Sequence, residues 1–289
     1  MTGHLAFEVV DVFTDTAFAG NPLAVVLGAE QLQTSQLQAL AREFNLSETA
    51  FPMPAPDGDD VVAPTATYGL RIFTPTTELP FAGHPSVGSA SVLHRLGRIA
   101  IGPNVQACGA GLLPVEVSED SVTLTGGAPT VGPPVEAAPV LTALGLQDAD
   151  LVGPAIRWAG AGIEFAHVLV RPEALDAVRP DTAAVAALGG SGVSLSSWDG
   201  ETARTRVFPG GVGIFEDPAT GSAALGFGVF LAASDLLGDG THQYVVRQGV
   251  EMGRPSTLRC SVEVSGGVAT TTRVSGSSVP IARGEIRVP

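Results

Sequence analysis

The stretch that decides the fold is a seven-residue motif that occurs twice. The first copy is HPSVGSA, residues 84–90, and the second is DPATGSA, residues 217–223. Each copy follows a short strand-like segment that contains Arg and Phe, RIF at 71–73 and RVF at 206–208. Each also leads into an apolar run of small residues that predicts a helix. The matching flanks indicate a duplication, with two similar halves related by a pseudo-two-fold axis.

The start of each predicted helix is a candidate ligand site. Pro85 and Pro218 suit the first helical turn, so we expect His84 and Asp217 at or beside the N-cap. Free N–H groups and the helix dipole favour an anion there. Two such starts facing each other would hold a small carboxylate from both sides. The alternative is an ordinary structural helix start, which is the commoner role for either copy alone. The matched pair, with unlike titratable residues, favours function.

Short strands and turns make up most of the remaining chain. A helix is expected at 34–44, with Thr34 as its N-cap and Asn45 at its end. Helices at 89–96 and 222–231 follow the motif copies. We expect strands at 7–13, 24–27, 46–51, 70–73, 113–117, 122–124, 167–170, 204–208, 244–246, 258–264 and 268–273.

The region of Gly and Pro near the middle of the chain suggests a domain junction. The run at 126–134 is rich in both residues. We therefore predict an N-terminal domain at 1–128 and a C-terminal domain at 129–289. The extreme C-terminal strand is a candidate to pack on the first domain.

Composition excludes several classes of function. The chain has 289 residues and a formal net charge of −14, and all 15 of its basic residues are Arg. Without Lys there is no anchor for pyridoxal phosphate, no Schiff-base aldolase and no Walker phosphate loop. The negative charge disfavours nucleic acid and anionic membranes as partners. No apolar run reaches the ~18 residues of a membrane span, and no signal peptide is evident, so a cytoplasmic protein is expected.

Glu48 is the second candidate site residue. It lies in LSETAF, residues 46–51, a short strand-like segment with no other charge. Burial would raise the pKa of this Glu and suit it to acid–base work near neutral pH. The alternative is an edge strand with Glu48 in solvent.

Four segments together resemble the phenazine-biosynthesis PhzF family. They are FAGNPLAV at 18–25, NLSETAF at 45–51, RIFTP at 71–75 with ELPFAGHP at 78–85, and EDPATGSA at 216–223. The resemblance covers essentially the whole chain. It implies a diaminopimelate-epimerase-like α+β fold of two similar, pseudo-symmetric domains, each a curved, mostly antiparallel sheet around a central helix. The family's site lies in the cleft between these domains, and members are commonly homodimers.

The resemblance also implies an activity. It points to a cofactor-independent isomerase that moves a proton between carbons of a small carboxylated cyclic or unsaturated substrate, of the trans-2,3-dihydro-3-hydroxyanthranilate isomerase type. Glu48 would be the proton shuttle, while His84 and Asp217 would orient substrate polar groups and tune the proton transfers. The residues implied for the carboxylate pocket are Gly83, Gly221 and Ser222.

Two alternatives remain open at this point. One is a two-thiol amino-acid racemase or epimerase, for which the chain has Cys108 and Cys260. Both lie in strand-like contexts, whereas the equivalent helix starts carry His84 and Asp217. The other is a non-catalytic dimeric binder of small carboxylates. Neither cofactor nor metal is expected, because no His, Cys and carboxylate spacing fits a metal site and the acidic run 57–60 lacks the later Glu of a calcium loop.

Overall fold

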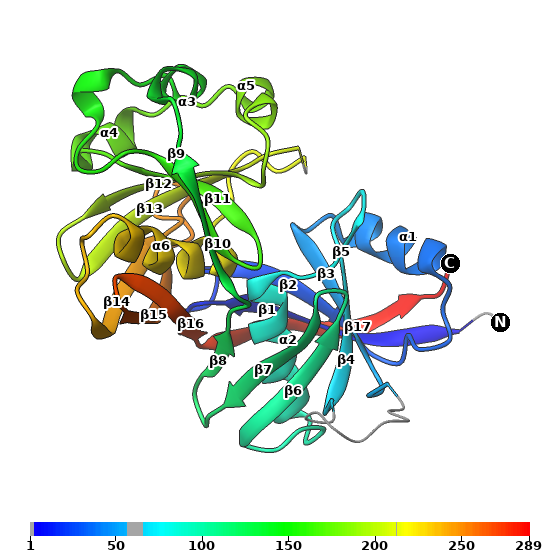
Figure 1. Cartoon of the computed structure of the whole chain (residues 1–289). Helices are drawn as coiled ribbons and strands as arrows, with labels where there is room; N and C mark the ends of the chain where they lie inside the picture. The colour runs from blue at the N-terminus through cyan, green and yellow to red at the C-terminus, as the bar shows by residue number, and fades with distance from the viewer. Residues whose placement is uncertain (1–2, 57–65, 212) are drawn as a thin grey trace. The chain divides into compact units, whose positions relative to one another are not determined.

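The computed structural model describes residues 3–56, 66–211 and 213–289. The chain is α+β and divides into two compact units. Unit 1 comprises Met1–Thr125 and Ser275–Pro289, and unit 2 is Gly126–Val274. The last strand of the chain therefore belongs to the unit that contains the first strand (Figure 1).

Unit 1 contains two helices among its described residues and a sheet of mixed pairing. Its elements are β1 (His4–Val12), β2 (Asn21–Val26), α1 (Thr34–Phe44), β3 (Glu48–Met53), β4 (Tyr68–Phe73), β5 (Glu78–Leu79), α2 (Gly83–Arg95), β6 (Gly102–Cys108), β7 (Gly111–Val117), β8 (Val122–Thr125) and β17 (Ser278–Arg287).

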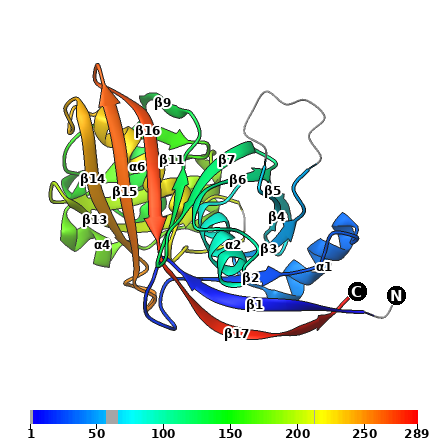
Figure 2. The same cartoon turned by 90° about the horizontal axis from the view of Figure 1, so that it is seen from below.

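Strand pairing in unit 1 runs from β17 to β8. Strand β1 pairs antiparallel with β17 on one side and with β2 on the other. The long β1–β17 ribbon is clear in Figure 2. Strand β2 is parallel to β3, β3 is antiparallel to β4, β4 is parallel to β6, and β6 is antiparallel to β7. Strand β7 then pairs antiparallel with β8.

Helix α2 is the central helix of unit 1. It contacts β1, β2, β3, β7, β8 and β17, and almost all of its residues are buried. The close approach depends on Gly88, where an added Cβ would lie 2.6 Å from Leu23 Cδ2 and 2.7 Å from Val12 Cγ2. An interior helical Gly costs roughly 1 kcal/mol in helix propensity. Here the missing side chain lets the helix rest directly on β1 and β2.

Unit 2 repeats this architecture with an added helical layer. Its elements are β9 (Pro129–Pro134), α3 (Ala137–Leu144), the 3-10 helix η1 (Asp148–Asp150), β10 (Arg157–Ala161), β11 (Glu164–Leu169), α4 (Pro172–Ala177), α5 (Thr182–Ala187), β12 (Gly192–Trp198), β13 (Thr202–Pro209), α6 (Gly221–Ala233), β14 (Gly240–Gln248), β15 (Ser256–Ser265) and most of β16 (Val268–Gly276).

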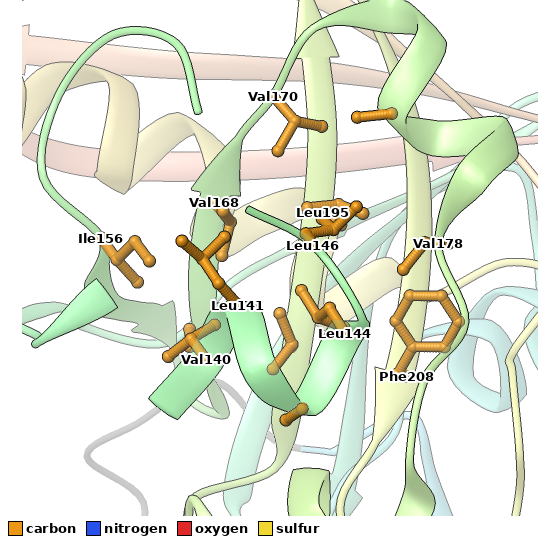
Figure 3. Packing of buried hydrophobic residues seen from close by; sticks show 14 of the residues in the cluster. Val140, Leu141, Leu144, Leu146, Ile156, Val168, Val170, Val178, Leu195 and Phe208 are labelled. Carbon is orange, nitrogen blue, oxygen red and sulfur yellow. The ribbon is translucent and has the colours of Figure 1, made fainter. Parts of the chain in front are cut away.

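Helix α6 occupies the position in unit 2 that α2 has in unit 1. It contacts β9, β10, β11 and β15, and it is buried around most of its circumference. A second apolar layer packs α3 and α4 against β11 and β12. Its core includes Leu141, Leu144, Val168, Leu195 and Phe208 (Figure 3).

The order of strand pairings confirms that the two halves share one plan. In unit 2, β10–β11 is antiparallel, β11–β12 parallel, β12–β13 antiparallel, β13–β14 parallel and β14–β15 antiparallel. The same alternation runs through β1, β2, β3, β4, β6 and β7 in unit 1. In each unit the central helix follows the fourth of these strands. The predicted α+β class with a central helix in each half is therefore correct.

Most of the predicted elements are present, with differences at their ends. Helix α1 covers the predicted residues, and its C-cap is Asn45, whose φ of 51° is left-handed. Its N-cap, however, is Gln33 and not Thr34. Thr34 is the first helical residue, and its hydroxyl accepts a hydrogen bond from Arg71 Nη2 at 2.9 Å. The region 126–134, predicted only as a junction, contains strand β9, which pairs with β10.

Candidate functional site

Glu48 stands on a central strand of unit 1. It is the first residue of β3, which pairs with β2 on one side and β4 on the other. Its side chain is only 13% exposed. The alternative of a solvated Glu on an edge strand is therefore wrong. A carboxyl in this position is largely shielded from water.

The structure brings His84 and Glu48 together. Its Nε2 atom is 3.6 Å from Glu48 Oε2, and its side chain is 4% exposed. Burial lowers the pKa of His84 to about 3, so the ring is neutral at physiological pH. A separation of 3.6 Å is longer than a hydrogen bond. The pair is thus close enough to interact electrostatically without a direct hydrogen bond between the two side chains.

His84 lies further into its helix than the predicted place at or beside the N-cap. Helix α2 begins at Gly83, its N-cap is Ala82, and His84 is the second helical residue. Pro85 still lies within the first turn, where its missing N–H is tolerated. The Ser86 hydroxyl donates to the Ala82 carbonyl at 2.9 Å, which tightens this first turn.

The buried side-chain amide of Asn21 contacts the second ring nitrogen of His84, Nδ1. Asn21 Nδ2 lies 3.2 Å from His84 Nδ1, and Asn21 is fully buried. The Ser47 hydroxyl donates to Asn21 Oδ1 at 3.2 Å. These contacts join residues from β2, the turn before β3 and α2. Sequence reasoning did not assign a role to Asn21 or Ser47, although both lie in the segments that carry the family resemblance.

The turn before Asn21 requires a glycine. Gly20 has a φ of 67°, and a Cβ there would lie 2.4 Å from the Val12 carbonyl oxygen. No other residue fits this backbone without displacing β1. The GNP sequence therefore fixes where β2 begins and where the Asn21 side chain enters the protein.

Asp217 lies in unit 2, where a separate polar network holds it. Its N–H donates to the Val207 carbonyl of β13 at 3.0 Å, and the residue is 7% exposed. The Thr220 hydroxyl donates to Asp217 Oδ2. Gln248 Nε2 donates to the Asp217 carbonyl at 2.7 Å and to Thr220 Oγ1 at 2.9 Å. Because Gln248 already donates to this hydroxyl oxygen, the Thr220 proton is free to point at Asp217.

The second motif copy starts its helix later than the first. The N-cap of α6 is Thr220, Gly221 is the first helical residue and Ser222 the second. Asp217 and Pro218 therefore precede the helix, and the prediction of Asp217 at or beside an N-cap is wrong. The reason is local: Asp217 bridges to Val207, and Gln248 Oε1 accepts the Thr220 N–H at 3.1 Å. Ser222 is buried, and Gly221 starts the helix close to it. In unit 1 the corresponding predicted pocket residue, Gly83, starts α2 directly before His84.

The strands before the two motif copies carry matching ion pairs. Arg71 binds both carboxylate oxygens of Glu78 at 2.7 Å, and its guanidinium lies 5.2 Å from the Phe73 ring centroid. In unit 2, Arg206 binds Glu216 at 2.8 and 2.7 Å, and it lies 5.2 Å from the ring centroid of Phe208. The duplicated RIF and RVF segments thus preserve one contact set.

The two cysteines do not fit a thiol mechanism. Cys108 is the last residue of β6, and Cys260 is a buried residue of β15. Burial raises the pKa of the Cys260 thiol well above its ordinary value, which suppresses the thiolate. Neither cysteine lies at the start of α2 or α6. The two-thiol alternative is therefore not supported by the positions of these residues.

Within 3–56, 66–211 and 213–289, no three His, Cys, Asp or Glu side chains come together as a metal site would need. In the same ranges, none of the helices combines the length and apolar character of a membrane crossing. The acidic run 57–60, which lacks the later Glu of a calcium loop, lies outside the described residues.

Comparison with known proteins places the chain in a family. The structure superposes on a Bacillus anthracis phenazine biosynthesis protein of the PhzF family with a TM-score of 0.85, at 22% identity and covering 98% of this chain and 99% of that one. Residues 10–284 match the PhzC-PhzF family, described as phenazine biosynthesis-like protein. The chain belongs to this family, and it is an enzyme of the PhzF isomerase type.

Two relatives that are more than 30% identical to this chain are named as isomerases. An uncharacterized isomerase of Mesorhizobium japonicum is 36% identical, with 97% of this chain and 98% of that protein covered. A trans-2,3-dihydro-3-hydroxyanthranilate isomerase of Pseudomonas chlororaphis is 33% identical, with the same coverage.

Proposed function

We propose that the protein catalyses a cofactor-independent isomerisation in which Glu48 moves a proton between two carbons of a small carboxylated substrate. The observation that carries this proposal is the buried Glu48–His84 pair, with 3.6 Å between Nε2 and Oε2. A carboxyl on a central strand is a positioned general base, and one such base contributes about 10²–10⁴-fold to a rate. The neutral ring beside it is a fixed dipole for the charge that develops when a C–H proton leaves.

The proposed substrate is cyclic or unsaturated, because proton movement between carbons needs a conjugated system to spread the negative charge. The curated relative from Pseudomonas chlororaphis acts, by its name, on trans-2,3-dihydro-3-hydroxyanthranilate. That compound is the first candidate to test. The proposal assigns substrate binding to Gly83, Gly221 and Ser222, and the orientation of polar groups to His84 and Asp217.

Exchange of hydrogen with solvent tests the proposal directly. The candidate substrate is incubated with the enzyme in D₂O, and deuterium on each ring carbon is followed by NMR. We expect deuterium to enter carbon with the wild-type protein and to be lost with Glu48→Gln. The matched control is Glu116→Gln, an exposed Glu on β7, which should exchange like the wild type. Binding of the compound without exchange or turnover would favour the non-catalytic binder.

The same proposal includes a cytoplasmic homodimer. Light scattering of the purified chain tests the dimer, and fractionation of expressing cells tests the location. A monomer at micromolar concentration would remove the dimer from the proposal without affecting the assignment of Glu48.

A further inference from the structure

We propose that Asn21 is a positioning residue that keeps the His84 proton on Nε2, so that the ring presents an N–H to Glu48 and leaves Glu48 as the group that accepts a proton from carbon. This inference rests on the proposed function for its catalytic meaning. The tautomer itself is a property of the protein alone and is measured without substrate.

The Asn21 amide has a defined hydrogen-bond polarity toward the His84 ring. Asn21 Oδ1 accepts the Ser47 hydroxyl at 3.2 Å, so Nδ2 faces His84 Nδ1, also at 3.2 Å. An amide nitrogen only donates, and a neutral imidazole has one donor and one acceptor nitrogen. Nδ1 must therefore be the bare nitrogen and Nε2 must carry the proton.

The second argument is electrostatic and independent of the amide. Nε2 lies 3.6 Å from Glu48 Oε2, and both side chains are largely shielded from water. An N–H directed at a carboxylate is attracted to it, whereas a nitrogen lone pair in that place is repelled. The carboxylate side and the amide side of the ring therefore select the same tautomer.

The neutrality of the buried His84 ring makes the position of its single proton important. His84 is fully enclosed, and burial keeps its pKa far below its ordinary value. Since the ring does not become an imidazolium, it can donate from only one nitrogen. With the proton on Nδ1, the ring would direct a nitrogen lone pair at the Glu48 carboxylate, which repels it. The Asn21 amide excludes this arrangement.

The structure positions Asn21 firmly enough for such a role. The residue is fully buried, and its backbone pairs with Val12 in the β1–β2 ladder. Gly20 sets the turn that leads into it. Because Ser47 immediately precedes Glu48, the hydroxyl that orients the amide and the proposed base sit on adjacent residues. One short segment thus fixes both partners of His84.

The test reads the two ring nitrogens of His84 by long-range ¹H–¹⁵N correlation in the full chain labelled with [¹⁵N]histidine. His84→Gln identifies the signals by their loss. We expect a pyrrole-type Nε2 and a pyridine-type Nδ1 in the wild type. Asn21→Asp replaces the donor with a carboxylate that only accepts, so the proton should move to Nδ1 or a second proton should be added.

The matched control is Asn104→Asp. Asn104 is also a buried Asn of unit 1, but its amide donates to the carbonyls of Ala100 and Gly102. This variant should lose stability like Asn21→Asp while leaving the His84 signals unchanged. If Asn21→Asp does not fold, Ser47→Ala serves instead, because it frees the amide to turn and should produce a mixture of tautomers.

A wild-type Nδ1–H, or a tautomer that does not respond to Asn21→Asp or Ser47→Ala, would overturn the proposal. Turnover is a separate readout. If the candidate substrate is converted, Asn21→Asp should lower kcat by on the order of 10²-fold, within the range for general acid–base catalysis. If no substrate is converted, the proposed function fails while the tautomer result still stands or falls by itself.

Discussion

Arg206 donates hydrogen bonds to both carboxylate oxygens of Glu216 in the interior of unit 2. The Arg206 side chain is only 9% exposed and that of Glu216 only 7%. The related pair in unit 1, Arg71 with Glu78, has the same bidentate form at 30% and 36% exposure. The two units therefore contain the same type of ion pair, which is buried in unit 2 and open to water in unit 1. A third bond, from Arg206 Nη1 to the Leu175 carbonyl, adds to the buried pair.

Removing one partner should cost far more in unit 2 than in unit 1. Glu216→Gln leaves a buried guanidinium without its counter-charge, and we expect a loss of about 3–5 kcal/mol in the free energy of unfolding. Glu78→Gln should cost no more than about 1 kcal/mol, because its pair is open to water. Urea denaturation of both variants measures the difference. Equal losses at the two sites would contradict this assignment.

Acid should destabilise the protein through its two enclosed histidines. Burial lowers the pKa of both His84 and His167 to about 3, against 6.5 in the unfolded chain. The unfolded chain therefore binds protons first as pH falls. The stability that these neutral rings provide is complete above pH 6.5 and is lost progressively between about 6.5 and 3, at up to ~1.4 kcal/mol per pH unit for each His.

His167→Gln should flatten this dependence, because one titrating group is removed. The side chain lies among Phe227 and Phe230 in the core of unit 2, outside the Glu48 network. The slope of unfolding free energy between pH 6 and 5 measures the change, whatever the absolute stability of the variant. His4→Gln, on an exposed residue of β1, should leave the slope as it is. An unaltered slope in His167→Gln would count against the buried neutral ring.

Gly88→Ala should destabilise unit 1 despite the higher helix propensity of Ala. The new Cβ would lie 2.6 Å from Leu23 Cδ2 and 2.7 Å from Val12 Cγ2, so α2 would have to move off β1 and β2. Overpacking of this kind costs about 1–3 kcal/mol. Gly238→Ala is the control, because its Cβ would meet nothing within 4 Å. Thermal unfolding should separate the two variants, and a stabilised Gly88→Ala would refute the close-packing argument.

Thr220→Val should reduce activity, because the Asp217 carboxyl loses a hydrogen bond that orients it. The variant keeps the side-chain volume and removes the hydroxyl that donates to Asp217 Oδ2. Thr220→Ser retains the donor and should preserve most of the turnover. We expect a loss of about tenfold in kcat for Val, consistent with one hydrogen bond to a charged group. The same loss in Ser and Val would mean that the hydroxyl has no such role.

The repeated motif allows two similar halves to be predicted from the sequence, because a duplicated sequence pattern indicates a duplicated structure. The copies at 84–90 and 217–223 lead into α2 and α6, and the strands before them carry the matching Arg–Phe contacts. Strands with Pro and Gly, such as β9, were missed because their residues are typical of turns. Pairing with β10 stabilises β9 in spite of its composition.

The site could be predicted in part. Glu48 and His84 were grouped through the family resemblance, and the structure brings them together. The offset between the two helix starts was not visible, because it depends on Gln248, which is distant in sequence and reaches Thr220 only in the folded protein. The Asn21–His84 contact was hidden for the same reason, since it spans 63 residues. Residue type indicates which hydrogen bonds a side chain can make, but the partner itself depends on which residues the fold brings close.

The pairing of β17 with β1 has a consequence for synthesis on the ribosome. Strand β1 precedes unit 2 along the chain, whereas its antiparallel partner β17 is made only after all of unit 2. Unit 2 has its complete sequence available before unit 1 does. During translation the edge of β1 that β17 covers therefore stays unpaired until β17 has been made, and an unpaired strand edge is a template for pairing with other chains.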